Sequence, residues 1–293
     1  MSSALSGATI ETARPAPPEG RRPRRARRTT PRNTLGRGAG LGLGIAMLWF
    51  SLLVLIPLAA VIAAAGEGGW DGYFQVLRND QTWAAVTLTV GQALVVTVIN
   101  IFVGTIIAWV LVRDRFWGKS VLDVIIDVPF ALPTIVAGLV LLSLYGPNSP
   151  LGLHWAFTPN AVTLALAFVT LPFIVRTVQP VLEELETDVE DAAASLGATR
   201  FTTFRRVILP SLVPAIFAGA ALSFARGISE YGALVLISGN LPRSTEVVSV
   251  RLFSFLEGGN TEAAAAVATI MLLIALLAIV TLDIIQRRVA RRG

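Results

Sequence analysis

Six long apolar stretches constrain the fold of this chain more than any other feature of its sequence. A helix needs about 20 apolar residues to cross the ~30 Å hydrocarbon core of a bilayer. The stretches that meet this requirement are residues 40–65, 85–112, 121–145, 160–180, 212–237 and 263–286. The sequence therefore predicts an all-α membrane protein with six transmembrane helices.

The composition agrees with a membrane protein and excludes several kinds of chemistry. Only 15% of the residues are charged, whereas a soluble domain carries about a quarter. The chain has no cysteine and a single histidine, His154, so disulfides, cysteine metal sites and His-based clusters or triads are excluded. Gly118-Lys119-Ser120 resembles the end of a phosphate-binding loop, but Arg113 stands where the first glycine is required. We therefore expect neither an enzyme active site nor an ATPase site, and no cofactor bound by this chain itself.

Basic residues are concentrated in alternate loops, which predicts the orientation of the chain. Cytoplasmic loops of membrane proteins are enriched in Lys and Arg. The basic loops and the C-terminal tail contain Arg113, Arg115, Lys119, Arg200, Arg205, Arg206, Arg287, Arg288, Arg291 and Arg292, whereas the other loops contain only Arg78, Arg243 and Arg251. With six spans, this pattern predicts a multi-pass protein of the cytoplasmic (inner) membrane with both termini in the cytoplasm.

The first 38 residues differ in composition from the remainder. They are rich in Pro, Gly, Ser, Thr and Arg and contain few large apolar residues, so they cannot bury enough surface to offset the entropy lost on ordering. We expect a disordered Arg-rich cytoplasmic tail over residues 1–38, followed by one transmembrane domain over residues 39–290. The arginines of the predicted tail fix the topology or bind anionic lipid head groups. Nucleic-acid binding is not expected, because we attribute the preference for Arg over Lys to the codon composition of the source genome. A cleaved signal peptide is disfavoured, because the first apolar run is longer than the 7–15 residues of a signal sequence.

The polar loop of residues 181–211 has the features of a docking helix. An alanine-rich segment beginning at Asp191 reaches Gly197, and Leu209-Pro210 lies just before the next span. Alanine favours a helix, glycine ends one, and proline is common in a first turn. We therefore expect a short exposed helix and a restart at Leu209-Pro210. Small side chains such as Ala192 and Ala193 allow a partner to approach closely, and the charged flanks favour association. The alternative is a helix that only packs against its own subunit.

The spacing of this loop resembles the EAA loop of ABC-importer permeases. That pattern is Glu-Ala-Ala, three residues, Gly, nine residues, and then Ile-x-Leu-Pro. The chain keeps the spacing, with Asp191 in place of Glu and Val207 in place of Ile. Further runs, residues 127–138, 144–152, and 228–233 with 238–242, are similar to sulfate/thiosulfate permease subunits of the CysT type.

This resemblance implies a type I ABC-importer transmembrane domain whose EAA-type helix couples transport to ATP hydrolysis on other chains. The coupling residues would be Asp191, Ala192, Ala193, Gly197, Leu209 and Pro210. The implied partners are two ATPase subunits that bind ATP and Mg²⁺, a second permease subunit of the W type, and an extracytoplasmic sulfate-binding protein. The implied function is import of sulfate or thiosulfate. A molybdate or tungstate importer and an ATP-independent anion channel are the alternatives.

Charged residues inside the predicted spans are candidates for function, because burying a charge in a membrane is costly. Arg226 and Glu230 lie four residues apart near the middle of the fifth predicted span, so a helix places them on one face. Either they line the translocation path of an anionic solute, or they form an internal ion pair that holds the helices together. Asp123 and Asp127 fall in the first turns of the third predicted span, where carboxylates are favourable, and we expect them to be topological or structural.

Prolines and an outer loop complete the predicted organisation. Pro129 and Pro133 in the third span and Pro172 in the fourth interrupt backbone hydrogen bonding, so we expect kinks there. Residues 247–253, in the loop after the fifth span, are predicted to form a helix at the outer surface.

Overall fold

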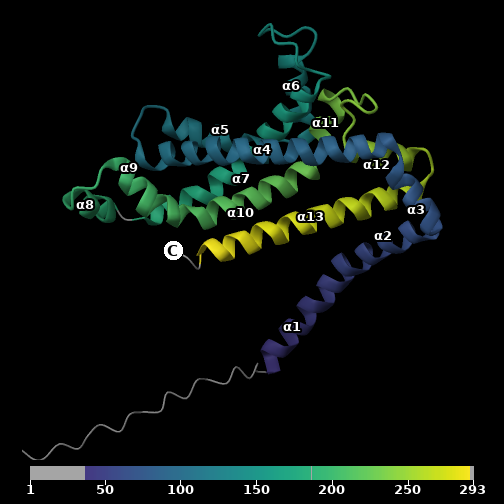
Figure 1. Ribbon diagram of the computed structural model, residues 1–293, viewed down its shortest axis with the longest axis horizontal. Helices are drawn as coiled ribbons and strands as arrows, with labels where there is room; N and C mark the ends of the chain where they lie inside the picture. The colour runs from purple at the N-terminus through teal and green to yellow at the C-terminus, as the bar shows by residue number, and fades with distance from the viewer. Residues whose placement is uncertain (1–36, 186, 291–293) are drawn as a thin grey trace, which may run out of the picture. The chain divides into compact units, whose positions relative to one another are not determined.

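The computed structural model describes residues 37–185 and 187–290 of the chain (Figure 1). All regular secondary structure in this part of the chain is helical. The chain divides into two units, one ending at Phe50 and one beginning at Ser51. The predicted tail over residues 1–38 lies outside the described residues, apart from Arg37 and Gly38, which open α1 (Arg37–Phe50).

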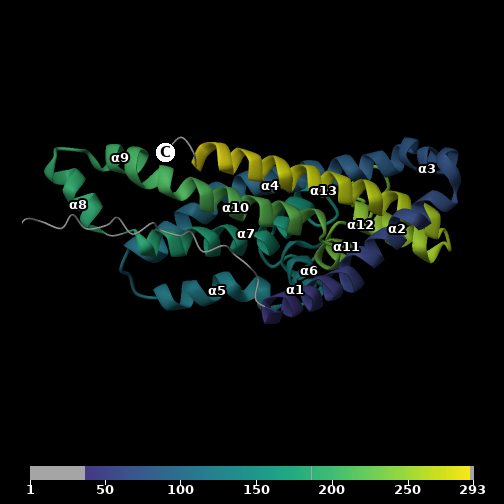
Figure 2. The same cartoon turned by 90° about the horizontal axis from the view of Figure 1, so that it is seen from below.

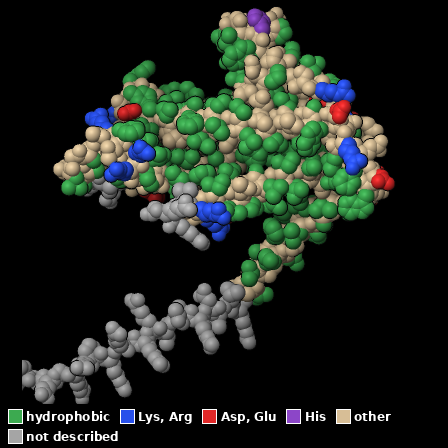
Figure 3. Space-filling view, in the orientation of Figure 1, with side chains coloured by type: hydrophobic (Ala, Val, Ile, Leu, Met, Phe, Trp, Pro, Cys, Tyr) green, Lys and Arg blue, Asp and Glu red, His purple; other side chains and the backbone are tan. Residues whose placement is uncertain are grey.

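The second unit is a bundle of helices. Its elements are η1 (Ser51–Leu55, a π-helix), α2 (Ile56–Glu67), α3 (Gly69–Arg78), α4 (Asp80–Arg113), α5 (Lys119–Ala131), α6 (Thr134–Tyr145), α7 (Pro159–Glu184), α8 (Thr187–Ser195), α9 (Arg200–Thr203), η2 (Phe204–Ile208, a π-helix), α10 (Leu209–Ile228), α11 (Gly232–Ile237), α12 (Val248–Glu257) and α13 (Thr261–Ala290). Figures 1 and 2 show α8 and α9 at one end of this bundle and α3 and α12 at the other. On the face in Figure 3, charged side chains lie mainly toward these two ends, with apolar side chains between them.

Five helical segments of the described chain are long and apolar enough to cross a membrane. They are Ala39–Glu67, Asp80–Arg113, Pro159–Glu184, Arg200–Ile228 and Thr261–Arg288. A sixth crossing is available if α5 and α6 together count as one span. The fold is therefore that of an all-α membrane protein with five to six spans, in agreement with the predicted class.

The third predicted span, residues 121–145, is not one continuous helix. α5 and α6 are bent by 115° relative to each other, and the break falls at Leu132 and Pro133. Proline has no backbone N–H and disfavours a helical conformation in the residue before it. Leu132 accordingly adopts an extended conformation, with φ −84° and ψ 135°. The kink expected from the prolines is in fact a complete interruption.

The fifth predicted span, residues 212–237, is also divided. Its helix begins earlier than predicted and ends at Ile228, and the short α11 follows after three residues. α11 packs directly on α6 (Figure 1). Two glycines make this contact possible, because a Cβ on Gly138 would lie 2.6 Å from the carbonyl oxygen of Ala233 and one on Gly232 would lie 2.9 Å from the amide nitrogen of Ile135. The interrupted parts of two spans therefore meet in the bundle.

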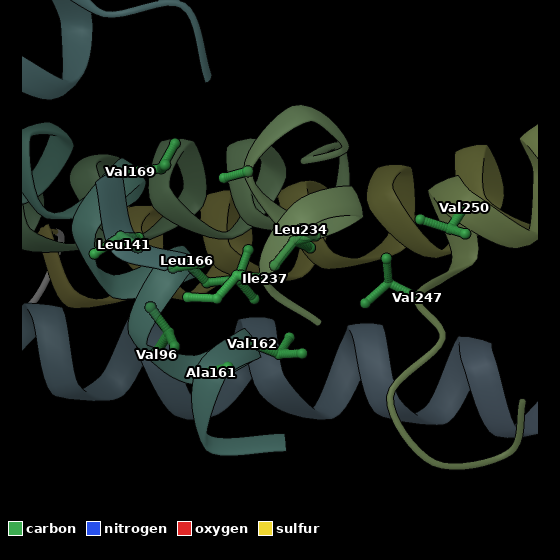
Figure 4. Packing of buried hydrophobic residues seen from close by; sticks show 12 residues of the cluster. Val96, Leu141, Ala161, Val162, Leu166, Val169, Leu234, Ile237, Val247 and Val250 are labelled. Carbon is green, nitrogen blue, oxygen red and sulfur yellow. The ribbon is translucent and has the colours of Figure 1, made fainter. Parts of the chain in front are cut away.

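The core of the bundle follows α7, which packs against both α4 and α10. Toward the α12 end, Leu166 of α7 is buried with Val96 of α4 and with Leu234 and Ile237 of α11 (Figure 4). Toward the α8 end, a second cluster buries Ile174, Val175, Val178, Leu182, Ile208 and Leu212. The same helix thus anchors both ends of the bundle.

Candidate functional site

The predicted docking segment forms a short helix at one end of the bundle (Figure 2). α8 ends as expected, because Gly197 adopts φ +82°, a left-handed conformation that glycine enters without steric cost. Its amide donates to the carbonyl of Ala194 at 2.9 Å, and the amide of Ala198 donates to the carbonyl of Ala193 at 3.0 Å. These two hydrogen bonds span three and five residues instead of the four of an α-helix. They occupy carbonyls of the last turn, which lack an intrahelical partner, and so end the helix.

The outward surface of this segment combines small residues with large apolar side chains. Asp191 and Ala192 are exposed, and Ala193 is half-buried. Leu196 is 89% exposed, and Phe201 is exposed as well. Exposed large apolar side chains beside a small-residue patch are typical of an interaction surface. Because these residues lie at an end of the bundle, a soluble partner can reach them.

The predicted restart at Leu209-Pro210 is wrong. The helix restarts at Arg200, with the side chain of Thr199 capping its first turn, and continues to Ile228. Leu209-Pro210 therefore lies inside a continuous helical segment. The π-turn Phe204–Ile208 precedes it, and the amide of Leu209 donates to the carbonyl of Phe204, five residues back. This wider turn already departs from the usual i→i−4 ladder, so the missing amide of Pro210 is accommodated without a break.

Arg113 attaches α8 to the spans. Its Nη2 lies 2.7 Å from Oε1 of Glu190 in α8 and donates to the carbonyl oxygen of Leu185 at 3.1 Å. Leu185 is the C-cap of α7, and Arg113 is the last residue of α4. In the sequence, Arg113 indicates only topology, because 77 residues separate it from Glu190 and both belong to charge-rich loops.

Arg226 and Glu230 form the ion pair that was one of their two predicted roles. Nη1 of Arg226 lies 2.7 Å from Oε2 of Glu230, whose side chain is fully buried. The helix that the sequence predicts to run through both residues is interrupted, because α10 ends at Ile228 and Glu230 falls in the break before α11. There Oε1 of Glu230 accepts a hydrogen bond from the amide of Ala233 at 2.9 Å, which satisfies a free N–H in the first turn of α11.

Arg176 of α7, which is not among the residues predicted from the sequence, is bound by two carboxylates of α5. Its Nε and Nη2 donate to Oδ1 and Oδ2 of Asp127 at 2.8 and 2.7 Å. Nη1 donates to Oδ1 of Asp123 at 2.8 Å and to Oε1 of Gln179 at 2.6 Å. Such forked pairing fixes geometry as well as charge. We call this group the Arg176 cluster.

The Arg176 cluster changes the interpretation of the two aspartates. The first turn of α5 contains no acidic residue, so Asp123 and Asp127 are not placed for a helix dipole. Their predicted structural role takes a different form, because together they tie α5 to α7. The signal in the sequence was the spacing of four residues between them, which puts both carboxylates on one helix face, together with an arginine inside the next span.

The opposite end of the bundle contains a buried carboxylate and the predicted outer helix. Glu246 is buried and accepts a hydrogen bond from Nε2 of Gln81, near the start of α4, at 2.7 Å. α12 covers Val248–Glu257, which confirms the helix predicted over residues 247–253. Within residues 37–185 and 187–290, no group of three or more His, Cys, Asp or Glu residues is arranged to hold a metal ion.

Comparison with known proteins identifies a family and a group of relatives. Residues 100–292 match the family described as binding-protein-dependent transport system inner membrane component. The chain is 42% identical to the sulfate transport system permease protein CysT of Salmonella typhimurium over 87% of this chain and 95% of that protein. It is 42% identical to CysT of Escherichia coli with the same coverage, and 41% identical to the probable sulfate transport system permease protein of Zygnema circumcarinatum over 83% of this chain and 88% of that one.

Solved structures show the same fold at low sequence identity. A chain of a bacterial alginate ABC transporter in complex with its oligosaccharide-bound periplasmic protein superposes with a TM-score of 0.72 at 16% identity, covering 86% of this chain and 94% of that one. A chain of the MetNI methionine ABC transporter in an inward-facing conformation gives a TM-score of 0.52 at 18% identity, covering 70% and 96%. The fold is that of a type I ABC-importer permease.

The family match and the apolar spans together make the chain a multi-pass inner-membrane protein. Its relatives are permease subunits rather than enzymes. The chain belongs to the family of binding-protein-dependent transport system inner membrane components and, within it, to the relatives of the CysT permeases.

Proposed function

We propose that this chain is the permease subunit of an ATP-driven importer of sulfate and thiosulfate. The observation that carries the proposal is the 42% identity to CysT, which extends over 95% of that protein and so includes both the spans and the docking loop. The alternatives from the sequence, a molybdate or tungstate importer and an ATP-independent anion channel, remain as outcomes of the test below.

The exposed docking segment supports the assembly that we propose. Two ATPase subunits, which bind ATP and Mg²⁺, dock on α8 of this chain and on the corresponding helix of a second, W-type permease. Asp191, Ala192 and Ala193 form the contact, and Gly197 ends the helix so that Leu196 remains exposed. With α8 in the cytoplasm, both chain termini lie in the cytoplasm too. An extracytoplasmic sulfate-binding protein delivers the anion at the opposite end of the bundle, near α12.

The mechanism that we propose is alternating access driven from the docking surface. Closure of the ATPase dimer displaces α8 and with it the cytoplasmic ends of the spans. The anion needs only weak contacts in the membrane, because the binding protein supplies the affinity. Arg226 and Glu230 are proposed to lie at the path, with the partly exposed Arg226 facing it, and the ion pair with the buried Glu230 leaves the arginine with little free charge to retain a dianion.

Uptake of labelled sulfate by cells that lack this gene, with and without complementation, tests the proposal. We expect the deletion to lose uptake and the restored gene to recover it, with strong competition by thiosulfate and little by molybdate. Unchanged sulfate uptake together with a loss of molybdate uptake would contradict the proposed substrate and keep the importer. Sulfate flux in membranes that contain this chain without ATPase subunits would favour the channel.

A further inference from the structure

One guanidinium group joins three elements at the docking end of the bundle. Arg113 ends α4, and it contacts Glu190 of α8 at 2.7 Å and the carbonyl oxygen of Leu185, the C-cap of α7, at 3.1 Å. Of the α8 side chains that the structure describes, residues 190–195, only Glu190 forms an ion pair or hydrogen bond with a span. The position of α8 relative to the bundle therefore depends strongly on this arginine.

The surroundings of Arg113 favour a firm contact. Its side chain is 16% exposed and that of Glu190 is 27% exposed, so solvent screens the pair less than an open surface pair. A cation at the C-terminus of α4 is also stabilised by the helix dipole. The carbonyl of Leu185 lies beyond the last turn of α7, where carbonyls lack an intrahelical partner. Arg113 satisfies that carbonyl and binds a carboxylate at the same time.

The helix that Arg113 ends reaches the other end of the bundle. α4 contains 34 residues, which corresponds to about 51 Å of helix. At its far end, Gln81 donates to the buried Glu246. If α8 moves Arg113, it therefore also moves α4, a rigid helix that extends from one end of the bundle to the other.

We propose that Arg113 is a positioning residue that transmits displacement of α8 to α4 and α7, with Glu190 as its partner. This inference rests on the proposed function, because it assumes that an ATPase moves α8. Without the ion pair, none of the α8 side chains that the structure describes, residues 190–195, would form an ion pair or hydrogen bond with a span. The ATPase would then still dock and hydrolyse ATP, but less of its motion would reach the spans.

The test uses the complete transporter, with ATPase subunits, second permease and binding protein, in proteoliposomes. Labelled sulfate uptake and ATP hydrolysis are measured on the same vesicles for Arg113→Gln, Glu190→Gln, Arg113→Lys and the exchange Arg113→Glu with Glu190→Arg. We expect each neutral variant to lower the sulfate transported per ATP about ten-fold, within the usual range of a coupling energy. The Lys variant should recover most of it, and the exchange only part, because a carboxylate at position 113 restores the ion pair but cannot donate to the carbonyl of Leu185.

A matched control is available in α13. Arg287 and Asp283 form an ion pair at 2.8 Å, but their side chains are 72% and 47% exposed and both lie on one helix. Arg287→Gln should leave the ratio of transport to hydrolysis unchanged. The proposal is overturned if the neutral variants keep the wild-type ratio, or if the exchange is no better than the single variants.

A second measurement does not depend on any variant of the ion pair. The chain has no cysteine, so spin labels can be attached at Ser195→Cys in α8 and Ile106→Cys on the exposed face of α4. We expect the distance between these labels to stay constant between nucleotide-free and ATP-bound transporter, because the two helices move together. A distance that changes with nucleotide would contradict the proposal. A complex that hydrolyses ATP but takes up no sulfate contradicts the proposed substrate instead, and the distance remains informative in that case.

Discussion

Gly138 of α6 lies against the backbone of Ala233 in α11, with no side chain between the two helices. A Cβ at position 138 would lie 2.6 Å from the carbonyl oxygen of Ala233 and 2.8 Å from its Cα. Backbone atoms cannot move aside as a flexible side chain does, so this contact requires glycine. Through it, the interrupted third span is held to the short helix that follows the fifth span.

Gly138→Ala is therefore expected to destabilise the protein by about 1–3 kcal/mol, as overpacking of a close contact does. The thermal midpoint of the purified protein in detergent measures this. Gly91→Ala is the matched control, because Gly91 lies in α4 with nothing within 4 Å of a new Cβ. There alanine should stabilise the helix by up to about 1 kcal/mol. Equal midpoints for the two variants would show that α6 and α11 do not pack as described.

Gly197→Pro is expected to abolish transport while the protein still inserts into the membrane. Proline fixes φ near −65°, whereas Gly197 requires φ +82°, so the end of α8 cannot form. The measurement is labelled sulfate uptake, normalised to the amount of protein in the membrane. Gly118→Pro is the control, since Gly118 also has positive φ, +89°, but lies in a different loop. Retention of transport by Gly197→Pro would argue against docking on α8.

A charged residue at Ala193 should prevent the ATPase from docking. Ala193 is half-buried on the small-residue surface of α8, and a carboxylate placed in a close protein contact loses its hydration without gaining a partner. We expect Ala193→Glu to lower the amount of ATPase that co-purifies with the permease at least ten-fold, which corresponds to about 1.4 kcal/mol. Ser195→Glu, at an exposed position of the same helix, adds the same charge as a comparison. Normal co-purification with Ala193→Glu would place the ATPase contact elsewhere.

Within the Arg176 cluster, loss of the arginine should cost more than loss of either aspartate. Arg176→Ala leaves two carboxylates four residues apart on one face of α5 without a cation, whereas Asp123→Ala leaves Arg176 paired with Asp127. We expect about 1.5–3 kcal/mol for the arginine, the usual range of a hydrogen bond to a charged group, and less for each aspartate. Denaturation in detergent provides the ranking. A ranking with either aspartate above the arginine would show that the cluster does not act as described.

The Arg176 cluster should also be accessible to water. Asp123 and Asp127 are about half exposed in the bundle, and charged groups inside membrane segments face cavities or partners rather than lipid. A membrane-impermeant thiol reagent should therefore modify Gln179→Cys, whose side chain is next to Arg176. It should not modify Ile106→Cys, an exposed apolar position of α4. The absence of native cysteine removes background labelling. Equal protection of both positions would place the cluster against lipid or tightly packed protein.

The features that the sequence predicted correctly are those set by local patterns. Apolar length located the spans, and the glycine at position 197 predicted the end of α8 because positive φ is a local requirement. The prolines at 129 and 133 indicated a disturbance, but which of them breaks the helix depends on packing. Pro129 remains inside α5, while Pro133 separates α5 from α6.

The features that the sequence did not predict are contacts between distant segments. Arg176 contacts Asp123 and Asp127 because α5 packs against α7. Arg113 contacts Glu190 because α4 and α7 both end at the α8 end of the bundle. Hydropathy counts such residues as interruptions or topology signals and contains no information about pairing. The error at Leu209-Pro210 has a different cause, because a π-turn upstream let the helix continue through a proline that usually marks a first turn.

The interruption at Pro133 divides the third predicted span into two helices, α5 and α6, and each is attached to a different part of the bundle. α5 is attached to α7 through the Arg176 cluster, and α6 is attached to α11 through Gly138. The joint between them contains an imide nitrogen with no hydrogen to donate, so bending there breaks no helical hydrogen bond. The angle between α5 and α6 can therefore change at this joint while each helix keeps its own attachment to the bundle.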